Sequence, residues 1–295
     1  MIGPTIAWLA DGRRLHLNHG PIDLIVEAFG EAEERQKAYA QAERRFRTIL
    51  EELVSELGEL RRPVTATPRP FRHPTARRME AAAAAHFPAF VTPMAAVAGG
   101  VADEMLAAMC DGRELSRAYV NNGGDVAFHL APGETIDAAI AGTGHGFADR
   151  LAVDAESPIR GIATSGWRGR SHSLGIADAV TVLAASAAEA DVAATLIANA
   201  VDLPDHPAIT RLPACELDPD SDLGERLVTQ HVSPLPREEI AAALDRGLAV
   251  AEPMAARGLI RSAALFLQGE TRVCGALAGA AGTLYKRPER TPCHA

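Results

Sequence analysis

The chain has 295 residues, of which 47% are hydrophobic and only 4% aromatic, so its core must be built mainly from aliphatic and alanine side chains. Its formal net charge of −9 at pH 7 argues against a nucleic acid or an anionic membrane surface as the main partner, because both require a basic surface. There is no signal-peptide pattern, no apolar run of about 20 residues and no close pair among the four cysteines. We therefore expect a cytoplasmic protein without a disulfide framework or a zinc site.

The first quarter of the chain predicts strands followed by one long helix. Residues 5–10 and 13–29 read as strands separated by the turn sequences DGRR and NHGP. Over residues 31–60, apolar side chains recur at three- and four-residue steps with charges between them, which predicts an amphipathic helix that covers a sheet. Residues 61–75 contain four prolines and are expected to form a surface linker.

Two further helices are predicted over residues 75–87 and 92–110, the second beginning with a Thr-Pro pair suited to a helix start. This second helix contains Gly99 and Gly100, and each glycine costs about 1 kcal/mol relative to alanine in a helix interior. One explanation is that another element packs closely against them. The other is that the backbone approaches an anionic ligand, because free N–H groups at a helix N-terminus favour anions.

The rest of the chain alternates strands with helices, which indicates a layered α+β fold. A helix is predicted over residues 187–201 and another over 236–258, with a break near Pro253. Residues 203–237, with six prolines and an acidic run, are expected to be irregular. Residues 259–279 read as a closing hairpin. Strands are expected over residues 117–121, 125–130, 134–142, 149–155, 160–166 and 178–186.

Two polar, glycine-rich stretches are candidates for a binding site. The residues Asn122, Gly123, Gly124 and Asp125 interrupt an apolar run, so they form either a tight turn between two strands or a bared backbone that a ligand approaches. The second stretch lies just before a buried strand, and its candidate residues are Thr164, Ser165, Gly166, Arg168 and Arg170. Its small donors and two guanidinium groups could bind a phosphate or carboxylate. The alternative is that it is a solvated surface loop.

Two more candidates concern catalysis and metal binding. His172 could act as a general acid or base, although a loop histidine is more often an ordinary surface group. Asp191 and Thr195 lie four residues apart in a predicted helix, so both project from one face and could share an oxygen-ligated cation such as Mg²⁺. The alternative is that Asp191 only stabilises the helix N-terminus and that Thr195 packs.

The order of these segments resembles the ApbE-like superfamily, which includes the FAD:protein FMN transferases, and resembles more closely a separate branch of that superfamily. The match covers about residues 90–200. Its motifs are PMAAVAG at 93–99, NGGD at 122–125, GIATSG at 161–166 with ADAV at 177–180, and ADVAAT at 190–195.

This resemblance implies a single α+β domain of the ApbE-like fold over residues 1–295, with residues 286–295 as a tail. It also implies that Asp191 and Thr195 hold Mg²⁺ against the pyrophosphate of FAD or a related phosphorylated cofactor. The motif residues Gly99, Gly100, Gly123, Gly124 and Asp125 would lie in a nucleotide cleft.

The chain also departs from the transferase pattern. There is no lysine near Gly99 and no D-P-x-T-G stretch, and either His172 or Arg170 takes the place of the family's histidine, depending on the alignment register. We therefore keep three hypotheses. The first is Mg²⁺-dependent transfer of a flavinyl or phosphoryl group. The second is a role in the biosynthesis of a C1-carrier cofactor of the tetrahydromethanopterin type, because this branch occurs in C1-metabolising organisms. The third is a non-catalytic binder, or a scaffold docked through residues 203–237. A phosphorylated small molecule is the expected ligand, and a homo-oligomer is compatible with all three.

Overall fold

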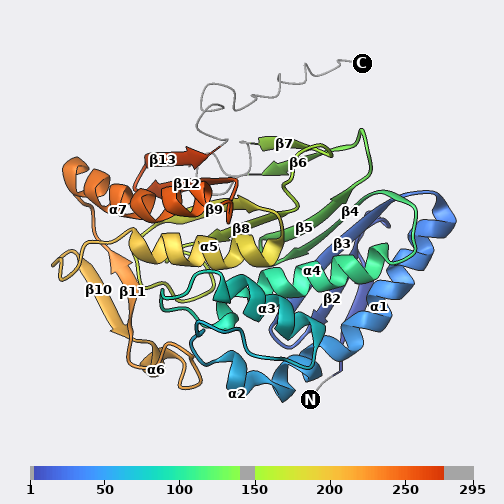
Figure 1. The fold of residues 1–295 in the computed structure, drawn as a ribbon, viewed down its shortest axis with the longest axis horizontal. Coiled ribbons are helices and arrows are strands. Elements are labelled where there is room, and N and C mark those ends of the chain that lie inside the picture. The colour runs from blue at the N-terminus through green and yellow to red at the C-terminus, as the bar shows by residue number, and fades with distance from the viewer. Residues whose placement is uncertain (1–2, 140–149, 276–295) are drawn as a thin grey trace.

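The computed structural model describes residues 3–139 and 150–275. Its centre is a nine-stranded antiparallel sheet with the strand order β1-β2-β3-β4-β5-β8-β9-β12-β13 (Figure 1). Two hairpins stand apart from this sheet, β6–β7 and β10–β11. The α+β class expected from the sequence is confirmed.

The strands of the central sheet follow the predicted segments closely. In the central sheet they are β1 Thr5–Trp8, β2 Leu15–His19, β3 Ile22–Gly30, β4 Leu115–Asn122, β5 Asp125–Leu130, β8 Gly161–Ser165, β9 Ala179–Ala184, β12 Ser262–Leu267 and β13 Glu270–Gly275. The separate hairpins are β6 Thr135–Ala139 with β7 Arg150–Asp154, and β10 Ile209–Pro213 with β11 Leu227–Val232. Part of the strand expected over 134–142 and of the hairpin expected over 259–279 lies outside the described residues, as does the tail 286–295.

The longer helices lie together on one face of the sheet (Figure 1). Helices α1 and α4 pack on the strands of the N-terminal half, and α5 and α7 pack on β8, β9, β12 and β13. The hairpin β6–β7 packs on the opposite face, where Phe128, Leu183 and Phe266 form a second apolar layer with Val153. The helices are α1 Ala32–Ser55, α2 Leu57–Leu60, α3 Pro74–Ala84, the 3-10 helix η1 Pro93–Ala96, α4 Val97–Cys110, α5 Ala187–Ala200, α6 Ala214–Leu217 and α7 Arg237–Ala256.

Burial along the strands reflects this layering. Strand β2 alternates between buried and partly exposed side chains, as expected for a strand with one covered face. Strands β9 and β12 are buried at every residue because both of their faces are covered. This explains why residues 178–186 read as an apolar run without alternation.

Three expectations about the helices and loops are corrected. The helix expected over residues 92–110 is the short helix η1 followed by α4, and the Thr92 hydroxyl donates to Asp222 instead of capping the helix. Helix α7 runs through Pro253 to Ala256, and the neighbouring Met254 is buried, so packing of the last turn offsets the hydrogen bond that the proline cannot donate. The segment 203–237 contains β10, α6 and β11 and is therefore not wholly irregular.

By length and composition alone, Pro93–Cys110 could cross a membrane, but half of that window is buried inside the fold. Its α4 part packs against α1, α5 and strands β4 and β5, as a core helix does.

Gly161 of β8 tests how tightly α5 is seated on the sheet. A Cβ added at Gly161 would lie 2.0 Å from the carbonyl carbon of Ser186 and 2.1 Å from the nitrogen of Ala187, and both atoms belong to backbone. We expect Gly161→Ala to lower the free energy of unfolding by about 1–3 kcal/mol, since backbone cannot move aside as a side chain can. Gly58→Ala in α2 is the matched control, because nothing lies within 4 Å of the added methyl group. Urea unfolding measures both, and equal stability of the two variants would contradict the prediction.

Candidate functional site

The central sheet splits between β5 and β8. These strands pair through Val126 with Ile162 and Ala127 with Gly161, and the Phe128 N–H donates to the carbonyl of Arg160 at 3.0 Å. On the other side the ladder ends at Val126, and the Asp125 carboxylate accepts the Thr164 N–H at 3.2 Å. A polar side chain therefore takes the place of backbone pairing at this point.

The NNGGD stretch is the turn that joins β4 to β5. Gly123 and Gly124 have φ values of 64° and 118°, which favour glycine, and the Asn121 side chain accepts the Gly124 N–H at 2.9 Å. The Asn122 amide donates to the carbonyl of Ala98 at 3.1 Å and so ties the end of β4 to the start of α4. The tight-turn explanation thus describes the geometry, and contact with a ligand stays a prediction.

Asp125 and Asp191 meet at this split, where their carboxyl groups lie close enough to interact electrostatically. Asp125 is only 7% exposed, and burial raises its pKa to about 7. Burial, followed by the nearby charge of Asp125, also raises the pKa of Asp191. Two carboxyl groups in contact cannot both be charged unless something positive lies between them, so the pair holds either a proton or a cation.

Helices α4 and α5 cap each other beside this pair. Asp191 of α5 accepts the backbone N–H of Gly99 in the first turn of α4 at 3.0 Å. In return, Asp103 of α4 accepts the N–H groups of Ala187 and Ala188 at the start of α5, at 3.0 and 2.9 Å. These carboxylates satisfy donors that helix ends otherwise leave unpaired.

The close approach of the two helix ends also explains the helical glycines. A Cβ on Gly99 would lie 2.2 Å from the carbonyl oxygen of Ala187. A Cβ on Gly100 would lie 2.9 Å from the Met79 side chain of α3. Close packing of neighbouring elements therefore accounts for both glycines, which was one of the two explanations that the sequence offered.

The oxygen atoms of the carboxyl pair suit a hard cation, because such cations prefer carboxylate and hydroxyl oxygens as ligands. Thr195 lies one helical turn beyond Asp191 on α5. Among the described residues, no group of three or more His, Cys, Asp or Glu side chains is arranged to hold a metal. A cation at Asp125 and Asp191 would therefore complete its coordination with oxygens of other kinds, such as the Thr195 hydroxyl or a ligand phosphate.

The loop between β8 and β9, residues 166–178, is called the site loop below. The guanidinium of Arg170 reaches the NNGGD turn, with its Nη1 atom 3.5 Å from the position that a Gly123 Cβ would take. Arg168 instead pairs with Asp178 at 2.5 Å and stacks over Trp167 at 4.7 Å. Of the two arginines expected to meet phosphate, the structure thus places Arg170 against the turn that carries Asp125.

The remaining candidates lie around these groups. The Thr164 hydroxyl is within 2.9 Å of the Thr181 hydroxyl, and Ser165 ends β8 half-buried. Gly166 is tightly packed, since a Cβ there would lie 2.6 Å from the carbonyl oxygen of Asp178. His172 is exposed on the site loop. Their contact with a ligand stays a prediction.

Two aspartates that organise the site were not singled out from the sequence. Asp103 caps α5, and Asp178 accepts both the Arg168 side chain and the Gln268 N–H at 2.6 Å. The signal for Asp103 was its position four residues after Gly99, on the same helix face. Asp178 stood inside the ADAV motif.

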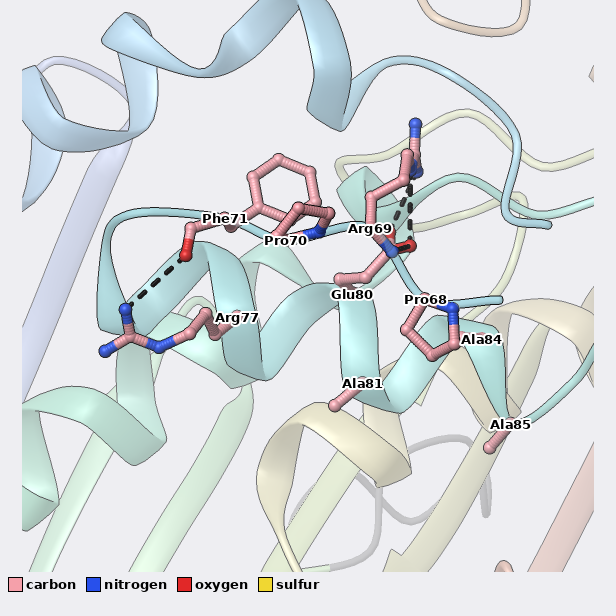
Figure 2. Close-up of a pocket in the computed structure, with 9 residues that line it drawn as sticks. All are labelled: Pro68, Arg69, Pro70, Phe71, Arg77, Glu80, Ala81, Ala84 and Ala85. Carbon is pink, nitrogen blue, oxygen red and sulfur yellow. Dashed lines mark hydrogen bonds and ion pairs between the residues drawn. The ribbon is translucent and has the colours of Figure 1, made fainter. Parts of the chain in front are cut away.

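A hollow of about 570 Å³ lies elsewhere, between residues 68–71 and α3 (Figure 2). Its rim includes Arg69, whose guanidinium pairs with the buried Glu80 at 2.8 Å and so fastens the Pro-rich linker to α3. None of the site residues expected from the sequence lines it.

The family model described as AbpE bacteria matches residues 6–273. This finding confirms the ApbE-like resemblance and extends it beyond the motif region at 90–200.

Similar curated proteins are UPF0280 proteins of archaea. One from Methanopyrus kandleri is 38% identical over 109 residues, 37% of this chain and 43% of that protein. One from Methanoregula boonei is 34% identical over 140 residues, 46% and 57% of the two chains. One from Methanocaldococcus jannaschii is 43% identical over 116 residues, 37% and 45% of the two chains. The chain thus spans about half the length of the curated relatives it matches.

Among solved structures, the apo flavinyl transferase ApbE of Pseudomonas stutzeri covers 95% of this chain and 97% of its own, with 12% identity and a TM-score of 0.46. A point mutant of the flavin transferase ApbE of Vibrio cholerae covers 94% and 99%, with 14% identity and a TM-score of 0.38.

The carboxyl pair should make stability depend on pH. In the folded protein both carboxyl pKa values are raised, so between pH 4 and 7 the folded state binds more protons than the unfolded state. The free energy of unfolding therefore falls as pH rises through this range. Asp125→Asn keeps an acceptor for Thr164 and removes one titrating group. Between pH 5 and 8 in EDTA, we expect the free energy of unfolding of wild type to fall by on the order of 2 kcal/mol more than that of this variant.

Urea unfolding at several pH values measures this difference. Asp220→Asn is the control, because Asp220 lies exposed on the surface. Equal pH slopes for wild type and Asp125→Asn would show that the pair does not titrate as described.

Proposed function

This chain belongs to the family described as AbpE bacteria, and from that premise we propose that it binds a phosphate-bearing, nucleotide-type cofactor such as FAD, together with a divalent cation, at the split of its sheet. The observation that carries the proposal is the contact between the carboxyl groups of Asp125 and Asp191, directly beside the turn that Arg170 reaches. A cation between carboxylates and a guanidinium nearby form the combination that binds phosphate oxygens.

Each residue has a distinct part in this proposal. Asp125 and Asp191 hold the cation with the Thr195 hydroxyl, and the cation supplies positive charge that neutralises phosphate oxygens. Arg170 donates hydrogen bonds to a phosphate at the NNGGD turn, where Gly123 has no side chain to block its approach. Arg168 is held by Asp178 and serves mainly to shape the site loop.

The mutual capping of α4 and α5 limits where the phosphate can bind. Among the first N–H groups of α5, those of Ala187 and Ala188 are taken by Asp103 and that of Glu189 by Ser186. In the first turn of α4, the Gly99 N–H is taken by Asp191. A phosphate would therefore be bound by the cation and Arg170, and not by a free helix N-terminus.

We also propose that the bound cofactor is a substrate for Mg²⁺-dependent transfer of a flavinyl or phosphoryl group. Release of AMP from FAD in the presence of a protein or small-molecule acceptor measures this. The absence of AMP release from a complex that does bind FAD would favour the non-catalytic binder, which the missing lysine near Gly99 also favours.

A second candidate ligand is a precursor of a pterin-type C1 carrier. It is favoured by the UPF0280 relatives from Methanopyrus, Methanoregula and Methanocaldococcus, since the ApbE-like branch resembled here is associated with methane and C1 metabolism. Phosphorylated pterin precursors can be titrated in parallel with FAD, and tighter binding of the pterin would favour this candidate.

Calorimetric titration with FAD, with and without Mg²⁺, tests the binding site. We expect wild type to bind FAD more tightly with Mg²⁺, and Asp191→Asn to lose this dependence because an amide is a poor magnesium ligand. We expect Arg170→Ala to weaken binding roughly tenfold to a hundredfold, the usual range for a lost charge-assisted hydrogen bond.

Arg44→Ala is the matched control, because Arg44 is also an exposed arginine but lies on α1, among the helices of the N-terminal half. Unchanged Mg²⁺ dependence in Asp191→Asn would rule out the cation site. An Arg170→Ala variant that binds like Arg44→Ala would rule out the phosphate contact.

A further inference from the structure

The end of the site loop farther from β8 is fastened by neighbouring elements. The Leu174 N–H donates to the Asn199 side chain of α5 at 2.9 Å, and the Leu174 carbonyl accepts from Nη1 of Arg211 at 2.6 Å. The carbonyl of Ser173 accepts the Thr229 N–H at 2.9 Å. The backbone of this end of the loop is thus held by α5 on one side and by the hairpin β10–β11 on the other.

The beginning of the site loop is fastened as well. The Trp167 N–H donates to the carbonyl of Ala177 at 3.0 Å, and the Trp167 ring meets the edge of His231 on β11 at 6.5 Å. Between the two fastened ends, Arg170, Ser171 and His172 are exposed. The position of Arg170 therefore depends on where both ends are held.

Arg211 is the side chain that joins the hairpin to the loop. It lies on β10 opposite Thr229, its side chain is 17% exposed, and its second guanidinium nitrogen pairs with Asp202 in the segment after α5. An arginine can serve a carboxylate and a carbonyl at once because its donors are fixed in a planar fork. One side chain thus fixes β10, the end of α5 and the site loop relative to one another.

We propose that Arg211 is a positioning residue for phosphate binding, which acts by holding the Leu174 carbonyl so that Arg170 stays beside Gly123. This inference rests on the proposed function. It gives the hairpin β10–β11 a role in supporting the site loop, since the Thr229 N–H and the Arg211 side chain both donate to backbone carbonyls at one end of that loop.

A first experiment needs no ligand. The chain has two tryptophans, and Trp8 is on β1, where its ring packs on Tyr39. In a Trp8→Phe background, the fluorescence of Trp167 reports the site loop alone. We expect Arg211→Ala to raise the acrylamide quenching constant of Trp167. Arg246→Ala is the matched control, because Arg246 donates to the carbonyl of Asp202 at 3.3 Å and does not touch the loop.

A second experiment separates positioning from general stability. We expect Arg211→Ala to weaken Mg²⁺-dependent FAD binding roughly tenfold in wild type, but by less than about twofold when Arg170 is already replaced by alanine. Such non-additivity is expected only if Arg211 acts through Arg170. Thermal unfolding of each variant verifies that it is folded at the titration temperature.

The outcomes are distinguishable. Unchanged Trp167 quenching in Arg211→Ala, or an equal loss of affinity with and without Arg170, would overturn the positioning role. If wild type binds no FAD with Mg²⁺, the proposed function fails and the role in binding fails with it. Increased quenching would in that case still show that Arg211 fixes the loop.

Discussion

The mutual capping of α4 and α5 is the contact on which the arrangement of this protein depends. Each helix places an aspartate on the first turn of the other, Asp191 on α4 and Asp103 on α5. Since α4 packs on β4 and β5 while α5 packs on β8 and β9, this contact aligns two halves of a sheet that are otherwise joined by a short ladder. The absence of a side chain at Gly99 is what allows the helix ends to come so close.

The same contact gives Asp191 two tasks. One of its oxygens satisfies a helix end, and its carboxyl group also meets Asp125. Asp191 stabilises the start of α4, but its burial beside the Asp125 carboxyl group also raises the energy of the charged pair. The folded protein keeps this costly pair where the Asp125 carboxylate takes the place of backbone pairing between β5 and β8. Carboxyl groups with strongly perturbed pKa values often, but not always, mark functional sites.

Much of the fold follows from local sequence patterns, and the site follows only in part. Most strands and the helix at residues 32–55 were predictable because periodicity is a local property. The helix expected over 31–60 nevertheless ends at Ser55, and residues 57–60 form the separate short helix α2. The reason for Gly99 could not be predicted from local sequence, because it depends on the close approach of Ala187, which lies far along the chain. Asp125 and Asp191 were each singled out, but their contact depends on β5 lying next to β8. The hairpin inside residues 203–237 was missed because prolines mask strand patterns, although Pro213 is tolerated at the end of β10.

The strand order also has a consequence for how the chain is made. Strand β9 is buried at every residue, yet its partner β12 is synthesised only after the whole segment from α5 to α7. At roughly 5–20 residues per second on a ribosome, β9 has an unpaired apolar edge for several seconds. Such an edge is a template for pairing with other chains. The nascent protein is therefore most exposed to aggregation late in translation, and any truncation before Ser262 would make that exposure permanent.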